Sequence, residues 1–316
     1  MSIKNMMNMT APVRESFNIP YHDIGPVESN PAIALVSGLH GDEINGVYIL
    51  SRLVHFLKEV EKGSYPKFKL VKRAVIIPAV NVLGINTLRR AWPFDNTDIN
   101  RMFPGNIMGE TTQRIAYSVL ETTKRADFRI DLHSSNLFFE EIPQIRIYDP
   151  GPETVKISRM FGLSTIMVRK SSPVFTTTLM SSWSYWPGHN FLLQIGRAGS
   201  IQLDYCQRVF QSIMDFMGKI GVISGLQISE SDEETFVFQP SHSVNVYAEK
   251  AGMFVSDKTV GKWVLGGEEL GYIYDSFNGD VISNVTAPVS GLLTGIRRHP
   301  MLFEGDHLLR ICRKPE

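Results

Sequence analysis

The stretch that decides the fold is residues 31–43, which reads PAIALVSGLHGDE. Its first part is an apolar run rich in β-branched residues, which predicts a buried strand over residues 31–39. His40 and Glu43 then follow, three positions apart, where a helix is expected to begin. A neutral imidazole and a carboxylate are ligand types that zinc accepts in catalytic sites. The pair alone is a common pattern, so later segments decide its meaning.

Two later segments extend this pattern. Residues 98–105 read DINRMFPG, and residues 130–135 read IDLHSS. The latter predicts another strand that ends in a histidine, His133, 90 residues after Glu43. A third protein ligand of this kind completes a His/Glu/His set that leaves one zinc position open for water. The alternatives are a structural metal site and polar side chains satisfied within the core.

The composition excludes several classes of protein. The chain has 316 residues, with 32 Lys+Arg and 32 Asp+Glu, so nothing indicates a nucleic-acid surface or an acidic membrane patch. No apolar run approaches the roughly 18 residues of a membrane span, and residues 1–10 lack the continuous apolar stretch of a secretory signal. Cys206 and Cys312 have no metal-type spacing, which predicts free thiols in a reducing cytoplasm.

Strands alternate with helices over the first two thirds of the chain. Apolar residues spaced three and four apart predict a helix over residues 44–61. Further strands are expected at 72–80, 127–133 and 191–196, and further helices at 111–124 and 204–220. This alternation predicts an α/β fold with a mainly parallel mixed sheet flanked by helices. Sites in such sheets lie beyond the carboxyl ends of the strands, where His40 and His133 both fall.

The sequence changes character after residues 229–234, an acidic and Ser-rich stretch that reads SESDEE. Beyond it, short β-type runs are separated by glycines, which predicts a small all-β domain. We therefore predict a zinc-binding catalytic domain over residues 1–228 and a C-terminal β domain over residues 236–316. The second domain is expected to shape one wall of the cleft.

The three ordered motifs resemble the succinylglutamate desuccinylase/aspartoacylase family of the zinc carboxypeptidase superfamily. The family pattern is Gly-x-His-Gly-x-Glu, then Asp-x-Asn-Arg-x-Phe-Pro-Gly, then Asp-Leu-His, and this chain matches all three in order. The resemblance spans residues 30–225 and continues more weakly to the C-terminus. It implies a zinc carboxypeptidase-like fold and one zinc ion per chain, held by His40, Glu43 and His133.

The resemblance also implies roles for residues around the metal. Asn100 and Arg101 match family residues that hold the substrate's carboxylate, a task that suits a guanidinium because it binds a carboxylate through two parallel hydrogen bonds. The alternative is a loop arginine paired with Asp98. Arg89 and Arg90 fall where the family carries an arginine that polarises the scissile carbonyl, and we assign this role to Arg90.

Two more polar residues lie near these motifs. Asp131 precedes His133 by two positions, so in a strand both side chains face the same way. Asp131 is expected to orient a ligand or an arginine, or to form a simple salt bridge at the end of the strand. Asn81 begins a turn, and is either a support for these groups or a plain turn former.

The chain departs from the family pattern at Gln194. Family members carry a glutamate on this late strand, which acts as general base on the zinc-bound water and as proton donor to the leaving amine. A carboxamide cannot accept and return a proton at neutral pH, and such proton transfer contributes about 10²–10⁴-fold to the rate. We expect Gln194 to position the water. The alternative is a displaced base at Glu140 or Glu141.

These predictions favour a zinc-dependent amide hydrolase that deacylates an N-acyl amino acid or a similar small carboxylate. One alternative is a metallocarboxypeptidase acting on a peptide or cell-wall fragment, which needs a longer groove. Another is a metal-bound, weakly catalytic ligand-binding protein, because Gln194 replaces the expected glutamate. The expected partner is a small N-acyl carboxylate, with no nucleic acid and no membrane, in a cytoplasmic protein whose assembly as a homo-oligomer stays open.

Overall fold

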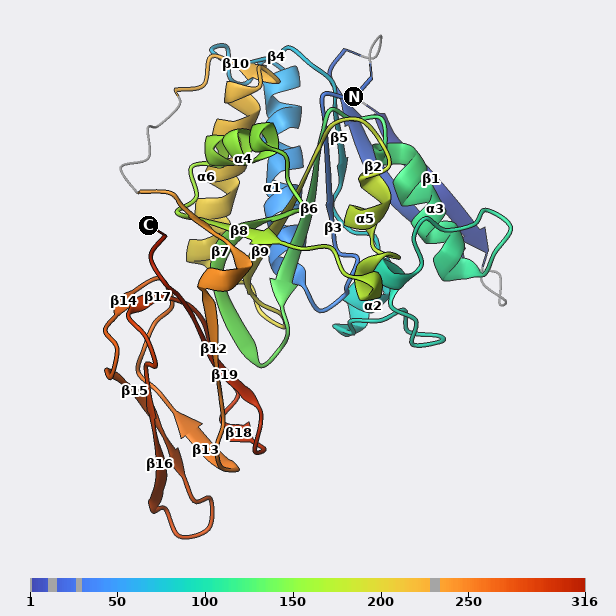
Figure 1. Ribbon diagram of the computed structural model, residues 1–316. Helices are drawn as coiled ribbons and strands as arrows, with labels where there is room; N and C mark the ends of the chain where they lie inside the picture. The colour runs from blue at the N-terminus through green and yellow to red at the C-terminus, as the bar shows by residue number, and fades with distance from the viewer. Residues whose placement is uncertain (1, 11–15, 27–29, 228–233, 316) are drawn as a thin grey trace.

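A computed structural model describes residues 2–10, 16–26, 30–227 and 234–315. Within these residues, one 13-stranded sheet links the N-terminal strands to the C-terminal ones (Figure 1). In spatial order its path is β1 (Ser2–Thr10), β2 (Ser16–Ile24), β5 (Ala74–Ile77), β3 (Ile33–Ser37), β6 (Phe128–Ser135), β9 (His189–Arg197), β7 (Phe139–Tyr148), β17 (Gly291–Arg297), β19 (His307–Cys312) and β12 (Ser243–Tyr247). Three strands lie off this path: β8 (Thr165–Arg169), β11 (Phe236–Phe238) and β14 (Trp263–Val264).

Two smaller sheets, six α-helices and four 3₁₀ turns complete the described structure. A two-stranded sheet pairs β10 (Ile223–Ser224) with β4 (Lys69–Leu70), and a four-stranded sheet runs β16 (Val281–Thr286), β15 (Glu269–Tyr274), β13 (Gly252–Val255) and β18 (Met301–Leu302). The α-helices are α1 (Ile44–Glu61), α2 (Val82–Thr87), α3 (Thr111–Thr123), α4 (Pro152–Ser158), α5 (Leu179–Trp183) and α6 (Leu203–Lys219). The 3₁₀ turns are η1 (Ile99–Arg101), η2 (Arg159–Phe161), η3 (Pro173–Phe175) and η4 (Pro240–His242).

The centre of the large sheet is parallel, as the sequence predicted. β3 pairs in parallel with β5 and β6, and β6 pairs in parallel with β9. β3 is buried along its whole length, because a central parallel strand is covered on both faces. The strands expected here and the helices α1, α3 and α6 are confirmed to within a few residues.

The large sheet is mixed, as predicted, but it is not mainly parallel. On one side of the centre, the β1–β2 and β2–β5 ladders are antiparallel. On the other side, the ladders of β7 with β9 and β17, and of β19 with β17 and β12, are antiparallel too. For β7 the connection explains the direction. A short turn after β6 reverses the chain, so β7 runs opposite to β6 and to β9, which lies between them and is parallel to β6.

Side chains of β3 alternate between two cores. Leu35 packs into the core that contains the apolar faces of α1 and α6, whereas Val36 packs into the core that contains α3 and α5. Figure 1 shows α1 and α6 on one side of the sheet and α3 and α5 on the other. This two-sided cover holds the carboxyl ends of the central strands in place.

The C-terminal strands form a core of their own but remain part of the large sheet. Leu293 and Leu309 belong to this core, together with Ile142 and Met167 from β7 and β8. β17 also pairs with β7. The region is built from strands in its described part, as the sequence predicted, while the acidic stretch 229–234 lies almost entirely outside the described residues. The division into two domains stays a prediction.

Two smaller predictions concern the thiols and the membrane. Cys206 and Cys312 are both buried and free, which confirms the prediction of unpaired thiols. None of the helices in the described part of the chain combines the length and the hydropathy of a membrane-spanning segment.

We expect limited proteolysis of the native protein to cut first between residues 225 and 240, because the sequence there is acidic and Ser-rich. The two fragments should stay together during gel filtration, since β17 pairs with β7 and β11 pairs with β8. Mass spectrometry of the fragments locates the cut. A first cut within residues 130–220 would contradict the predicted boundary.

Candidate active site

Three buried side chains meet at the carboxyl ends of β3 and β6. After β3, Gly38 takes a positive φ of 66°, a conformation that glycine adopts without strain. The turn carries His40 over the sheet edge and brings Glu43 to the N-cap of α1. His133 lies on β6, the parallel neighbour of β3. His40, Glu43 and His133 are exposed by only 3%, 3% and 5%.

The ligand atoms of these three residues all lie within 4.8 Å of one another. His40 Nδ1 lies 2.7 Å from Glu43 Oε1, and His133 Nδ1 lies 2.8 Å from Glu43 Oε2. Despite its short distance to Glu43, the buried His40 Nδ1 makes no hydrogen bond among the described residues. The three side chains thus bring nitrogen and oxygen atoms that can bind a metal to one small, buried space. The donor set therefore fits a divalent metal such as zinc.

Each histidine is held from behind by a carboxylate. His40 Nε2 lies 3.0 Å from Asp98 Oδ1, and His133 Nε2 lies 2.8 Å from Asp131 Oδ2. A carboxylate on the far nitrogen fixes the tautomer and the ring orientation of a metal-binding histidine. This leaves the Nδ1 atoms of both rings to face Glu43. Asp131 thus contacts His133, as one of the two sequence predictions expected.

The electrostatics of this cluster favour charged carboxylates. Burial would raise the pKa of Glu43, but the charges of His40 and His133 hold it well below its usual range. Burial lowers the pKa of His133, yet Asp131 and Glu43 outweigh it and raise the pKa to about 10. The cluster contains three carboxylates, those of Glu43, Asp98 and Asp131. If both histidines were neutral, only Arg90 would balance part of this negative charge, so the histidines bind extra protons. A bound divalent cation would replace those protons.

Glu43 occupies an N-cap position without acting as a cap. Its side chain makes no capping hydrogen bond to α1, although an N-cap side chain normally stabilises a helix by about 1 kcal/mol. Instead, Glu43 Oε2 accepts a hydrogen bond from the Ser134 backbone N–H at 2.8 Å, and Oε1 accepts one from Arg90 Nη1 at 3.0 Å. The hydrogen bonds of the Glu43 carboxylate are therefore with residues of the candidate site and not with the backbone of α1.

Arg90, and not Arg89, reaches the cluster. Besides Glu43, its guanidinium contacts Asp98, with Nη2 3.2 Å from Oδ2. Arg90 lines the cavity beside the three ligands. Its backbone carbonyl accepts a hydrogen bond from Asn81 Nδ2 at 3.3 Å, while Asn81 Oδ1 caps α2. Asn81 is therefore both a turn former and a support for the loop that carries Arg90.

Asn100 and Arg101 lie together on η1 at the cavity wall. Asn100 Oδ1 accepts a hydrogen bond from the Leu179 N–H at 3.0 Å, and its Nδ2 lies 3.5 Å from His133 Nε2. Arg101 bonds to the Asn100 carbonyl and lies over the Phe175 ring, 5.5 Å from the ring centroid. Its guanidinium is not paired with Asp98, whose ion pairs are with His40 and Arg90.

Gln194 lies beside the cluster on the neighbouring strand. It is the register partner of His133 in the β6–β9 ladder, is exposed by 5%, and lines the same cavity. This cavity has a volume of about 540 Å³, within the range of small-molecule sites. The carboxamide of Gln194 thus lies next to the candidate metal ligands.

The alternative bases, Glu140 and Glu141, are both engaged elsewhere. Glu140 accepts hydrogen bonds from Tyr205 Oη at 2.6 Å and from Arg298 Nε at 2.7 Å, and it does not line the cavity. Glu141 lines the cavity, but both of its oxygens contact Arg146 Nη2 at 2.7 Å. Burial would raise the pKa of Glu141, yet the charges of nearby arginines hold it at about 2. Such a carboxylate is a poor base at neutral pH.

Sequence reasoning missed the opposite wall of the cavity. Arg146 and Tyr148 reach it from β7, where they alternate with Ile145 and Ile147 of the core. This alternation was a readable signal for a half-buried strand. Arg310 reaches the wall from β19 near the C-terminus, and no local pattern marks it. Hydroxyl and amide side chains supply much of the remaining wall: Ser134, Ser135, Asn136, Ser171, Ser172, Thr176, Thr178, Ser181, Ser184 and Asn190.

Comparison with known proteins places this geometry in a family. Residues 29–216 match the succinylglutamate desuccinylase/aspartoacylase catalytic domain. The chain belongs to this family. One relative is the N-alpha-acetyl-L-2,4-diaminobutyric acid deacetylase of Halomonas elongata, 25% identical over 298 residues, which are 90% of this chain and 83% of the relative.

Solved structures share the fold along almost the whole chain. A family member from Rhodobacter sphaeroides is 20% identical with a TM-score of 0.78, over 98% of this chain and 94% of that one. The product-bound ectoine utilization protein EutE (DoeB) of Ruegeria pomeroyi is 18% identical with a TM-score of 0.76, over 97% and 93% of the two chains. The C-terminal strands therefore belong to the shared architecture.

Purified protein is expected to hold one zinc ion per chain, and His133→Ala should lose it because two ligands cannot hold a catalytic zinc tightly. Elemental analysis of both proteins after dialysis measures this. The control is His189→Ala, which removes a histidine that lies on β9 and does not line the cavity. Equal zinc content in wild type and His133→Ala would overturn the ligand assignment.

Asp98→Asn should weaken zinc binding by about 10- to 100-fold, the typical effect of losing the carboxylate behind a metal-binding histidine. Competition with a chelator of known affinity measures the change. Asp95→Asn, three residues earlier in the same loop, is the matched control, because Asp95 bonds to the Thr97 N–H and does not line the cavity. If both variants bind zinc equally, Asp98 does not orient His40 for the metal.

Proposed function

We propose that this protein is a zinc-dependent amide hydrolase that deacylates an N-acyl amino acid. The observation that carries the proposal is the convergence of His40, Glu43 and His133 at the cavity, with ligand atoms within 4.8 Å and a carboxylate behind each histidine. The family match adds the chemistry, because the family is named for a desuccinylase and an acylase. The Halomonas relative is named as a deacetylase of an acetylated amino acid.

The residues around the metal ligands suit the steps of amide hydrolysis. When bound, zinc lowers the pKa of its water and polarises the scissile carbonyl. Arg90 contacts Glu43, so its guanidinium lies where it would stabilise the oxyanion that develops on the carbonyl oxygen. Asn100 and Arg101 would hold the α-carboxylate of the amino acid, which fixes the amide relative to the ligands.

Gln194 would position water without taking its proton. Its carboxamide can accept one hydrogen bond from water and donate two others, but it cannot carry a proton between water and the leaving amine. Two described carboxylates besides Glu43 line the cavity, Glu141 and Asp149. Glu141 is paired with Arg146, and hydrogen bonds from Ser171 lower the pKa of the exposed Asp149, so neither is a suitable replacement base. We therefore propose hydrolysis with a rate limited by proton transfer.

A ligand-binding protein with little catalysis is the second candidate function. The observation that favours it is Gln194 itself, which lines the cavity beside His133 in place of the family glutamate. In this case the cavity would retain the acyl amino acid unhydrolysed. Screening zinc-loaded protein against N-acyl amino acids, by amine release and by calorimetry, distinguishes the two functions.

Gln194→Glu is expected to raise kcat by about 10²-fold or more, because it supplies the missing proton carrier and such groups contribute about 10²–10⁴-fold. Steady-state kinetics on the best N-acyl amino acid measures the gain. Glu140→Gln should change little, because that residue lies outside the cavity wall.

Gln194→Leu serves as the matched control for the carboxamide. It should keep its zinc and lose activity, because leucine cannot hydrogen-bond the water. An unchanged rate in Gln194→Glu, together with loss of activity in Glu141→Gln, would move the base to Glu141 and contradict the role of Gln194. Tight binding with no turnover in either wild type or Gln194→Glu would support the binding protein instead.

A further inference from the structure

Gln144 on β7 is a buried carboxamide without hydrogen-bond partners among the described residues. It is 0% exposed, and neither its Oε1 nor its Nε2 bonds to another residue in that part of the chain. Burying an amide without partners is costly, so nearly all buried polar groups in proteins bond to protein or to ordered water. Since no described protein group serves Gln144, we expect ordered water to do so.

Gln144 points to the face of the sheet that carries the cavity. Two residues further along β7, Arg146 pairs with Leu192 of β9, and both line the cavity. Ile145, between Gln144 and Arg146, points to the opposite face, where it joins the core that contains α1 and α6. Because side chains alternate along a strand, Gln144 and Arg146 share one face.

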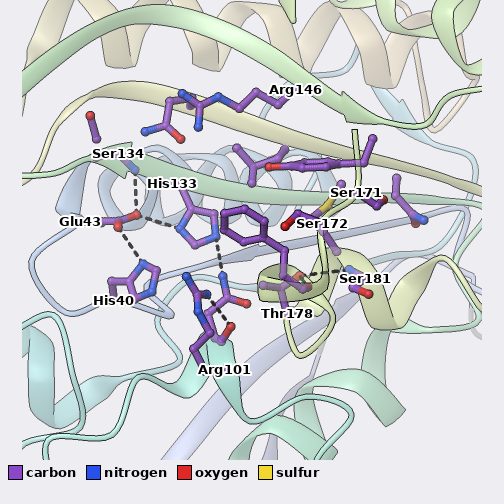
Figure 2. Close-up of a pocket in the computed structure, with 18 of the residues that line it drawn as sticks. His40, Glu43, Arg101, His133, Ser134, Arg146, Ser171, Ser172, Thr178 and Ser181 are labelled. Atoms are coloured by element: carbon purple, nitrogen blue, oxygen red, sulfur yellow. Dashed lines mark hydrogen bonds and ion pairs between the residues drawn. The ribbon is translucent and has the colours of Figure 1, made fainter. Parts of the chain in front are cut away.

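Gln144, Gln194 and His133 form one row across three neighbouring strands. Gln144 is the register partner of Gln194 in the β7–β9 ladder, and Gln194 is the register partner of His133 in the β6–β9 ladder. In Figure 2, Arg146 of β7 lies beyond His133 as seen from Arg101, so the β7 wall is on that side of the site. Register partners in antiparallel strands have Cβ atoms about 4.5–5.5 Å apart, so one water can join the two carboxamides.

Two neighbours of Gln144 present further polar atoms at the same place. Ile145 pairs with Ile166 of β8, and both belong to the core on the opposite face, so Thr165 lies beside Gln144 on the cavity side. Thr165 Oγ1 and Arg146 Nε are buried, and they too have no hydrogen-bond partner among the described residues. A buried water needs two to four polar partners, and this patch offers them.

The two ends of the Gln194 carboxamide differ in what they can do for hydrolysis. Its oxygen can accept a hydrogen bond from water at the metal ligands, whereas its NH₂ group can only donate. The hydrogen bonds of the other end decide which end faces the ligands. Gln144 lies on the side of Gln194 away from His133, so it is placed to bind that other end.

We propose that Gln144 is a positioning residue, which holds the Gln194 carboxamide with its oxygen toward the metal ligands through one ordered water. This water accepts a hydrogen bond from Gln194 Nε2 and donates one to Gln144 Oε1. The inference rests on the proposed function, because it concerns the residue that positions the reacting water. Gln144 does not line the cavity, so it acts only through Gln194.

Gln144→Met tests the proposal on the full zinc-loaded protein, because methionine has a similar length and forms no comparable hydrogen bond. The kcat for the best N-acyl amino acid should fall roughly 3- to 10-fold, the worth of one hydrogen bond. KM and zinc content should stay the same, because the proposed carboxylate and metal sites keep their residues. An unchanged kcat would overturn the proposal.

A second background separates positioning of Gln194 from general support of the fold. In Gln194→Glu the side chain ends in two equivalent oxygens, so no choice of orientation remains. The loss of kcat caused by Gln144→Met should therefore largely disappear in the Gln194→Glu background. An equal loss in both backgrounds would show that Gln144 only supports the fold.

Ser212→Ala is the matched control for the removal of a buried polar group. Ser212 Oγ on α6 is buried and has no hydrogen-bond partner in the described part of the chain, and the residue does not line the cavity. Ser212→Ala should leave kcat unchanged. A loss as large as that in Gln144→Met would mean that any such change lowers activity, which would overturn the proposal.

Thermal unfolding keeps the test independent of turnover. If water joins Gln144 to Gln194, Gln144→Met should lower the Tm of the zinc-loaded wild type, and lower it less in the Gln194→Leu background. If Gln144 has no partner at all, Gln144→Met should raise the Tm, because it removes a costly buried amide. A lowered Tm that depends on Gln194, without hydrolysis of any N-acyl amino acid, would refute the hydrolase and keep the link between the two residues. Hydrolysis with a raised Tm and an unchanged kcat would refute only the link.

A crystal structure of the zinc-loaded wild type decides the question if Gln144→Met fails to fold. Ordered water within hydrogen-bond distance of both the Gln144 and the Gln194 carboxamides is the expected result. A Gln144 side chain that bonds to neither water nor Gln194 would overturn the proposal.

Discussion

The parallel pairing of β3 with β6 is the constraint on which the rest of the site depends. It brings the turn with His40 and the helix start with Glu43 next to His133, although 90 residues separate Glu43 from His133 in the chain. The two cores that cover β3 keep this register, because a slip by one residue would exchange the two faces of the strand. The convergence of the three candidate metal ligands then depends on packing elsewhere along β3, which is why these side chains can be nearly inaccessible and still lie together.

Much of the fold near β3 could be predicted from sequence because the signals there are local. A continuous apolar run predicts a central strand, and the spacing within residues 44–61 predicts α1 to the residue. The antiparallel flanks could not be predicted in the same way. Their pairing depends on where short turns reverse the chain and on which distant strand is free to accept a partner. β17 pairs with β7 although about 150 residues separate them in the chain, and no local sequence pattern predicts this pairing.

The same division applies to the candidate site. Short sequence motifs contain His40, Glu43 and His133, and these residue types are typical of metal ligands. The three side chains lie together in the structure, as the sequence predicted. The contacts that orient the two histidines are partly local and partly distant in sequence. Asp131 is two residues from His133, whereas Asp98 contacts His40 from a separate loop. Arg310 is the opposite extreme. Its place in the cavity follows from the strand order of the finished sheet, so only the structure reveals it.

Gln194 affects the net charge of the cavity in the same direction as two arginines on its far wall, Arg146 and Arg310. A glutamate at position 194 would place a negative charge beside the metal ligands, whereas the carboxamide leaves that place neutral. Arg146 and Arg310 add positive charge at the far wall, and Glu141 offsets only part of it. Both features make the charge of the cavity less negative than a glutamate at position 194 would. Compared with a glutamate, the glutamine at position 194 lacks both a group that can carry a proton and a negative charge.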